Sequence, residues 1–201
     1  MFQDTRKEMQ AHFVDFISSI SGIIATDAHG REMNVEEGIE RTVQRVAKLA
    51  HDASSLIFIG NGGSAAIASH QSTDFLKTCK IRAFAPLDHS LITCMGNDCG
   101  FENVFAEPLR VIAQKGDLLI AISSSGRSQN ILNAVAVCKE NGCDVVTLSG
   151  FDEKNALRAL GWINFYVPSS SYRIVESAHL FICNWLLEFT IRSLSTEYTE
   201  P

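Results

Sequence analysis

The chain has 201 residues, of which 46% are hydrophobic and 20% charged, and its net charge is −6. This composition is typical of one globular domain, and we expect a single domain over residues 1–201. The negative charge argues against general nucleic-acid binding, which needs clustered Lys and Arg. No apolar run reaches the roughly 20 residues of a membrane helix. The six cysteines form no CxxC pair and no secretory leader precedes them, so we expect reduced thiols, no membrane segment and a cytoplasmic protein.

The N-terminal quarter of the chain predicts helices. Residues 5–24 place apolar side chains at helical spacing, and residues 35–52 do the same behind a capping-box sequence. The polar stretch DAHGREMN (27–34) predicts a loop between them. We therefore expect a helical prefix over residues 1–53.

The remainder, an expected α/β core over residues 54–194, alternates short apolar runs with helical stretches. The apolar runs are hydrophobic on both faces, as strands are when helices cover both sides of a parallel sheet. This predicts an α/β three-layer sandwich with a five-stranded parallel sheet. The predicted strands are 55–60, 81–86, 117–123, 144–150 and 163–168. The predicted helices are 63–77, 101–113, 127–141, 153–160 and 173–194, followed by a frayed tail over 195–201.

The segment SSSGRS (123–128) follows the third predicted strand and indicates a phosphate site. Ligands of open parallel sheets bind beyond the carboxyl ends of the strands. Hydroxyls, a glycine that permits a tight turn and a helix N-terminus together suit a phosphate group. An N-cap within a polar loop is the alternative. The hydroxyls belong to Ser123, Ser124, Ser125 and Ser128.

The segment GNGGS (60–64) follows the first predicted strand. A glycine-rich turn at this place allows the backbone to approach a ligand. The spacing Gly60-x-Gly62-x-x-Ala65 also satisfies the dinucleotide-binding pattern. That pattern needs an acidic residue at the end of the second strand, and the nearest one is Asp88. A nicotinamide-type cofactor site is therefore an alternative reading of this turn.

Two pairs of ionisable residues share helix faces. His70 and Asp74 stand at i and i+4, which suits a divalent metal or an acid/base site, or else an unoccupied exposed pair. Glu176 and His179 stand at i and i+3 on the apolar last helix. Burying them unpaired would be costly, so we expect both to face a pocket or a subunit contact.

A third polar segment, GNDCGF (96–101), lies between apolar stretches. We expect its Asn97 and Asp98 at a loop or at the start of a helix, where they would add to a polar rim. Helix capping alone is the alternative explanation of the aspartate.

These motifs together carry a resemblance to the sugar isomerase (SIS) family. They are GNGGSAAIASH, GNDCGF, AISSSGRSQNI and RIVESAH, in that order, within a similarity from about residue 35 to 192. The resemblance implies a flavodoxin-like sheet and a homo-oligomer, a tetramer with sites between subunits. It is strongest to the members that interconvert sedoheptulose 7-phosphate and D-glycero-D-manno-heptose 7-phosphate through an enediol, for surface-polysaccharide heptose.

The resemblance also implies roles for individual residues. The serines of SSSGRS would hold the phosphate, and the sugar would be contacted by Asn61, Gly62, Gly63, Asn97 and Asp98. His70 matches the first zinc ligand of the family, and Asp74 stands where the family has a catalytic, metal-binding glutamate. Aligning on His179 puts Glu176 at a ligand position, so that a Zn²⁺ site would comprise His70, Asp74 and Glu176.

One departure from the family pattern leaves two functional hypotheses. The same alignment puts Asn184 where the family has a catalytic histidine, and asparagine does not act as a general acid or base near neutral pH. The first hypothesis is an isomerase with Asp74 as base and His179, or else Glu176, as the second group. The alternative is a non-catalytic protein of this fold that binds a phosphosugar or a replication initiator.

Overall fold

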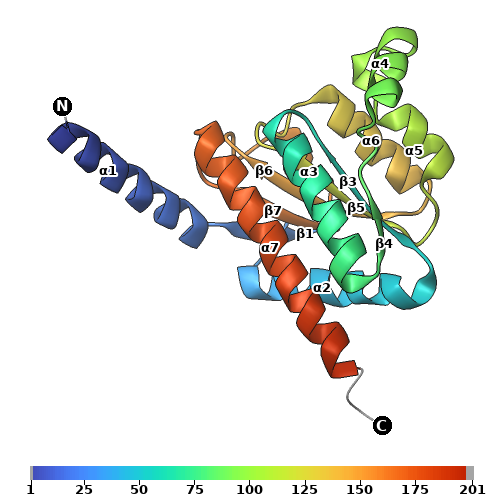
Figure 1. Ribbon diagram of the computed structural model, residues 1–201, viewed down its shortest axis with the longest axis horizontal. Coiled ribbons are helices and arrows are strands. Elements are labelled where there is room, and N and C mark those ends of the chain that lie inside the picture. Colours follow the sequence, from blue (N-terminus) through green and yellow to red (C-terminus); the bar gives the residue numbers. More distant parts are fainter. Residues whose placement is uncertain (1, 198–201) are drawn as a thin grey trace.

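The structure is a computed structural model that describes residues 2–197 (Figure 1). It contains one sheet between two layers of helices. The strands are β1 (Ile24–Asp27), β2 (Glu32–Met33), β3 (Ser55–Gly60), β4 (Arg82–Phe84), β5 (Leu118–Ser123), β6 (Asp144–Gly150) and β7 (Ile163–Val167). They follow the spatial order β2-β1-β7-β6-β5-β3-β4. The predicted α/β three-layer architecture is confirmed.

The five predicted strands form the parallel part of the sheet, in the order β4-β3-β5-β6-β7. Numbered along the chain, this is the flavodoxin-like order 2-1-3-4-5. Every residue of β3, β5 and β7 is buried, which explains why these strands are hydrophobic on both faces.

The prediction of five strands and a helical prefix was wrong between residues 24 and 33. This segment forms an antiparallel hairpin, β1 and β2, and β1 pairs antiparallel with β7. The hairpin turn is closed by Asp27, whose Oδ1 accepts the N–H groups of His29 and Arg31 at 2.8 and 3.0 Å. The expected loop DAHGREMN is therefore this turn and its second strand.

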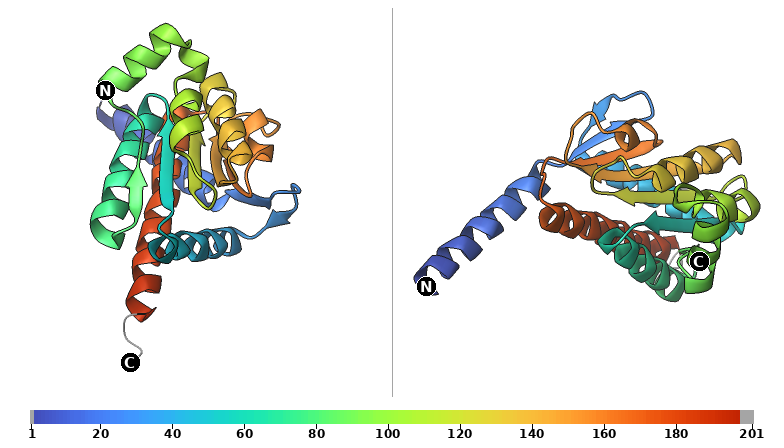
Figure 2. Two further views of the ribbon diagram at one scale, coloured as in Figure 1. Left: turned by 90° about the vertical axis from the view of Figure 1, so that its right-hand side faces the viewer. Right: turned by 90° about the horizontal axis from the view of Figure 1, so that it is seen from above.

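The helices divide between the two faces of the sheet (Figure 2). One apolar core cluster joins the sheet to α2, α3 and α7, and a second joins the opposite face to α5 and α6. The helices are α1 (Phe2–Ser21), α2 (Val35–Asp52), α3 (Gly63–Asp74), α4 (His89–Asp98), α5 (Ala106–Ile112), α6 (Gln129–Glu140) and α7 (Tyr172–Glu197). Short turns are η1 (Phe75–Cys79, a π-helix), η2 (Phe101–Asn103) and η3 (Ala156–Ala159).

Two helices differ from the prediction. The stretch 101–113 is divided between η2 and α5, and α4 occupies a segment for which no helix was predicted. No residue of α4 is fully buried, and only Ile92 and Met95 pack against the second core cluster, so its apolar pattern is short and weak. The predicted capping box of α2 is confirmed, because Asn34 Oδ1 accepts the N–H of Glu37 at 2.7 Å.

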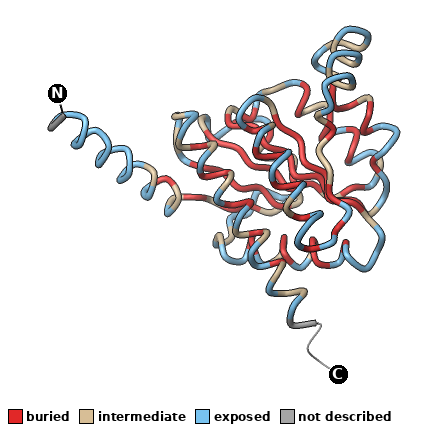
Figure 3. Tube along the Cα trace, viewed as in Figure 1, coloured by how far each residue is buried: buried red, intermediate tan, exposed pale blue. Residues whose placement is uncertain are grey.

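The first and last helices have different environments. α1 projects away from the body of the molecule, and most of its described residues are exposed (Figure 3). By length and composition alone, α7 could cross a membrane over Tyr172–Ser195, but 44% of its apolar window is buried inside the protein. It packs beside α2 and α3, as a core helix does (Figure 1).

Candidate active site

A polar cavity of about 120 Å³ lies beyond the carboxyl ends of β3 and β5. These two strands are neighbours at the point where the strand order reverses, which is where doubly wound sheets bind their ligands. The cavity is small beside the roughly 300–1,000 Å³ of pockets that enclose a whole drug-sized ligand. It is lined by Asn61, Ser64, Ile122, Ser123, Ser124, Ser125, Ser128, Tyr172 and Glu176.

Residues 123–128, here called the phosphate loop, form one wall of this cavity. Its turn is closed by Gly126, which has a φ of +62° and donates its N–H to Ser123 O at 3.0 Å. The buried Ser124 Oγ has no hydrogen-bond partner among the described residues. Ser128 is the N-cap of α6 but makes no side-chain cap bond, so the helix N-terminus stays open. Such a wall favours an anion.

Each glycine of GNGGS is required for a different structural reason. A Cβ on Gly60 would lie 2.5 Å from backbone atoms of Ser64, and Gly62 has a φ of +55°. A Cβ on Gly63 would lie 2.6 Å from Glu176 Cδ. The turn therefore brings the first residue of α3 against the carboxylate of α7, and a larger residue at 63 would displace that carboxylate.

Asn61 connects the glycine-rich turn to the start of α6. Its side-chain amide exchanges two hydrogen bonds with that of Asn130, of 3.0 and 2.8 Å. Asn130 is not recognisable as a site residue from the sequence, since an asparagine in the first turn of a helix carries no distinctive signal. The pair holds the two ligand-facing loops at a fixed separation.

The cavity contains one carboxylate side chain among its lining residues, that of Glu176. Beside it stands Tyr172, 59% exposed, whose ring contacts that of Phe151 edge to face with centroids 4.6 Å apart. The contact of Tyr172 and Phe151 beside the cavity was not predicted, because Tyr172 resembles any other first residue of a helix in the sequence. Glu176 thus faces a pocket as expected.

His179 does not line the cavity. It is completely buried, and its Nε2 lies 3.2 Å from Ser149 O, while its Nδ1 has no hydrogen-bond partner among the described residues. Burial lowers the pKa of His179 to about 4, and the hydrogen bond with Ser149 opposes this only in part. The expectation that it faces a pocket together with Glu176 was wrong, since the His179 side chain is enclosed in the core and only Glu176 reaches the cavity.

The buried His179 predicts a pH-dependent stability. Its folded-state pKa is below the unfolded value of 6.5, so the unfolded chain binds more protons between these values. The contribution of His179 is fully present above pH 6.5 and falls by about 3 kcal/mol as the pH drops towards 4. Urea unfolding at pH 7 and at pH 4 should show a larger loss for the wild type than for His179→Gln. Equal losses would contradict this prediction.

His70 and Asp74 face each other on α3, with Nε2 and Oδ2 3.1 Å apart. They lie outside the cavity lining, and Glu176 is not close enough to complete a site: within residues 2–197 no three His, Cys, Asp or Glu side chains form a metal-binding group. One chain therefore does not assemble the expected zinc set.

Asn184 is exposed, and its Oδ1 accepts a hydrogen bond of 2.8 Å from the buried Gln71.

Two further sequence predictions are not supported by the geometry. Asn97 and Asp98 end α4 instead of starting a helix, bond to each other at 2.7 Å, and do not line the cavity of this chain. Asp88, which a dinucleotide site would need, accepts the N–H groups of Ser90 and Leu91 as the N-cap of α4. Its carboxylate is thus engaged in capping, which argues against a ribose-binding role.

Together, the fold and the cavity define a doubly wound α/β protein with a polar, serine-lined pocket at its switch point. The SIS domain matches residues 24–150, and the chain belongs to the phosphoheptose isomerases of the SIS domain family. It is 32% identical to the phosphoheptose isomerase of Aliarcobacter butzleri (strain RM4018), over 80% of this chain and 88% of that relative. It is 34% identical to that of Campylobacter concisus (strain 13826), over 78% and 85%.

The fold is also that of a solved relative. The structure of phosphoheptose isomerase GmhA from Neisseria gonorrhoeae superposes with a TM-score of 0.79 at 26% sequence identity. The superposition covers 92% of this chain and 98% of that one. The resemblance first seen in four short motifs therefore extends over nearly the whole chain.

Proposed function

We propose that this protein is an aldose–ketose isomerase that interconverts sedoheptulose 7-phosphate and D-glycero-D-manno-heptose 7-phosphate. The observation that carries the proposal is the switch-point cavity, in which an open helix N-terminus and the unpartnered hydroxyl of Ser124 lie opposite a carboxylate. Its relatives named phosphoheptose isomerase support the choice of substrate.

We assign the two ends of the substrate to different groups of the cavity. The phosphate loop would bind the phosphate, and the cavity of about 120 Å³ has little room for more. The seven-carbon chain would then leave the cavity past Glu176 and Tyr172. The exposed ring of Tyr172 offers the carbon chain an apolar surface, and its hydroxyl remains available for the sugar.

Isomerisation moves one proton between adjacent carbons. A base removes one proton from C1 of the ketose while O2 gains a proton, which gives the enediol. O1 then loses its proton while C2 gains one, which gives the aldose. Glu176 is the group that this chain presents at its cavity for that transfer. Asp74 lies eleven residues beyond Gly63, about 16 Å along α3. We propose that any role of Asp74 in the proton transfer is at the pocket of a second copy of the chain.

The experiment for this proposal is proton NMR of sedoheptulose 7-phosphate with the purified protein in D₂O. We expect new aldose signals and deuterium incorporation at the exchanging carbon. Line broadening of the substrate without conversion would support the alternative, a non-catalytic phosphosugar-binding protein. One observation favours that alternative. The amide of Asn184 cannot act as a general acid or base near neutral pH, and His179 is buried.

A Zn²⁺ ion would need ligands from more than one chain. His70 and Asp74 supply two adjacent ligands on α3, a suitable half of a tetrahedral site, and bound zinc would polarise the substrate oxygens. Zinc content measured after dialysis, for the wild type and for His70→Ala, tests whether this pair holds metal.

The exposed side of α1 supports a homo-oligomer, for which we propose the tetramer of the family. Met9, Phe13, Val14 and Ile17 are 68, 64, 64 and 50% exposed, with Arg6 on the same side. On the body, an apolar groove of about 460 Å³ between α2 and α7 is rimmed by Glu36 and Glu40. We propose that it receives α1 of a second copy, because apolar surface and opposite charge match.

Phe13→Asp is expected to weaken this assembly. Burying a phenylalanine ring contributes about 2–3 kcal/mol, so the dissociation constant should rise by roughly 30- to 160-fold. Sedimentation velocity over a concentration series measures this. Ala11→Asp adds the same charge on the opposite side of α1 and is expected to leave the oligomer intact. An unchanged mass for Phe13→Asp would exclude α1 from the interface.

We further propose that the reaction takes place in the cytoplasm, with a small-molecule substrate and neither a nucleic-acid nor a membrane partner. All six cysteines are free thiols, which supports a reducing compartment. The net charge of −6 supports a substrate that is recognised locally, by the phosphate loop. The aldose product is suited to supply heptose for surface polysaccharide.

A further inference from the structure

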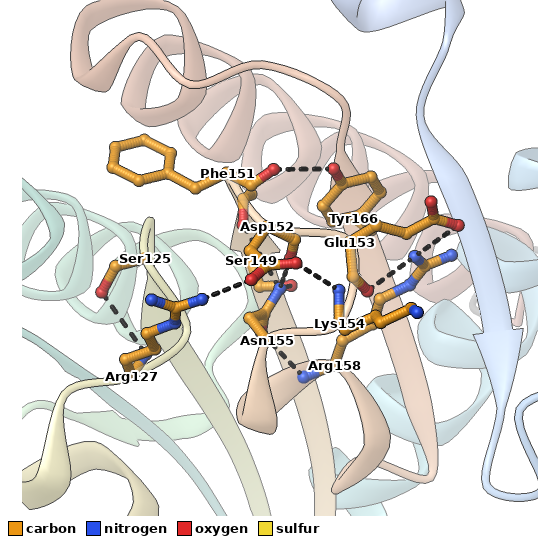
Figure 4. Close-up of polar contacts among 11 residues, drawn as sticks. Ser125, Arg127, Ser149, Phe151, Asp152, Glu153, Lys154, Asn155, Arg158 and Tyr166 are labelled. Carbon is orange, nitrogen blue, oxygen red and sulfur yellow. Dashed lines mark hydrogen bonds and ion pairs between the residues drawn. The ribbon is translucent and has the colours of Figure 1, made fainter.

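The phosphate loop is bonded to a second loop, which we call the support loop (residues 150–157). It connects β6 to η3 and was not singled out in the sequence. Two backbone hydrogen bonds join the loops: Gly150 N donates to Ser124 O at 2.9 Å, and Leu157 N donates to Gly126 O at 3.1 Å. An ion pair between Arg127 and Asp152 makes a third connection at the surface (Figure 4).

Asn155 lies at the centre of the support loop and is 3% exposed. Its Nδ2 donates to Gly150 O at 3.2 Å, to Asp152 O at 2.9 Å and to Ser149 Oγ at 3.2 Å. Its Oδ1 accepts the N–H of Arg158 at 3.1 Å and so caps η3 (Figure 4). One side chain thus fixes the backbone on both sides of the loop.

The same amide lies directly against the turn of the phosphate loop. A Cβ on Gly126 would overlap Asn155 Oδ1 and lie 2.8 Å from Asn155 Cβ. Gly126 therefore needs to be glycine for two reasons, its φ of +62° and this close approach. The position of the turn, and of the serine hydroxyls on either side of it, depends on where Asn155 is held.

We infer that Asn155 is a positioning residue for phosphate binding: it holds the support loop against Gly126 and so keeps the serine hydroxyls of the phosphate loop in place. The inference rests on the proposed function, since it assumes that this loop binds a phosphate. Asn155 itself does not line the cavity, so it would act on the phosphate only through the phosphate loop.

The test compares Asn155→Ala with Glu153→Gln. Glu153 belongs to the same loop but pairs with Arg158 at 3.3 Å, away from the phosphate loop, and serves as the control. We expect Asn155→Ala to raise both the KM for sedoheptulose 7-phosphate and the Kd for inorganic phosphate about 10-fold, with kcat within about 2-fold. Glu153→Gln should change neither constant.

The KM-against-kcat split distinguishes positioning from a purely structural role. Loss of stability alone would reduce the amount of active protein, and hence the apparent kcat, with KM unchanged. If Asn155→Ala fails to fold, Asn155→Ser replaces it, because serine is uncharged, can still cap η3, and lacks the Nδ2 donors to the support loop. Wild-type constants in the folded variants would overturn the inference alone. A wild type that neither binds phosphate nor converts the sugar would overturn the proposed function as well.

Discussion

Glu176→Gln is expected to lower kcat for the isomerisation by about 10²- to 10⁴-fold, the contribution of a positioned general base. Glutamine keeps the shape and the hydrogen-bonding reach of the side chain beside Gly63 but cannot accept the proton from C1. The proposed phosphate-binding serines form the opposite wall of the cavity, so the Kd for inorganic phosphate should change by no more than about 2-fold. NMR assays of samples quenched at successive times measure kcat, and calorimetric titration measures the Kd for phosphate.

Asp74→Asn is the matched comparison, since it removes the other candidate base. Near-normal turnover in Asp74→Asn together with the loss in Glu176→Gln would place the base in the cavity described above. Loss of turnover in Asp74→Asn with near-normal turnover in Glu176→Gln would assign the proton transfer to Asp74. Asp74 would then have to reach the pocket of a second copy, because it does not line the cavity of its own chain.

Gly63→Ala is expected to lower kcat by roughly 10- to 100-fold while leaving the protein folded. The added Cβ would lie 2.6 Å from Glu176 Cδ, and the carboxylate must move out of its position. The carboxylate is the end of a flexible side chain, so moving it costs little stability. A displacement of about 1 Å at a reacting group is enough to cost such a factor in rate. Kinetics and thermal unfolding, measured on the same preparation, separate the two effects.

Two other glycines provide controls for this variant. Gly96→Ala adds a methyl group on α4 where nothing lies within 4 Å, so neither kcat nor folding should suffer. Gly60→Ala directs its Cβ into backbone atoms of Ser64 at 2.5 Å, where no side chain can yield. It should destabilise the protein by about 1–3 kcal/mol. A Gly63→Ala enzyme with full activity would show that the position of Glu176 does not control the rate.

The sequence predicted the parallel core of the fold because its strands are buried on both faces and their apolar runs are continuous. The prediction of helices and strands failed where the side chains of an element are weakly buried or where a strand pairs with a segment far away in the sequence. Ile24 continues the apolar spacing of the first helix, yet it pairs with Tyr166 in β7, 142 positions further along the chain. Such a long-range pairing leaves no local pattern.

The candidate site was predicted in part for the same physical reasons. The serines 123–125 and 128 and Glu176 lie together, because strand ends of a parallel sheet converge and the final helix passes beside them. His179 was misassigned, since three residues along a helix turn the side chain from the cavity into the core. Asn130 bonds to Asn61 and Asn155 lies against Gly126, each on another loop, and nothing in their own sequence neighbourhoods indicates this.

The two edges of the sheet bear on how copies of this protein can associate. At one edge stands β2, two residues long, and at the other stands β4, with three. Such short edges offer few free backbone groups to a neighbouring strand, which protects the protein against open-ended sheet extension and fibril formation. Contact between copies is thereby directed to helix surfaces, where a closed assembly of defined size can form.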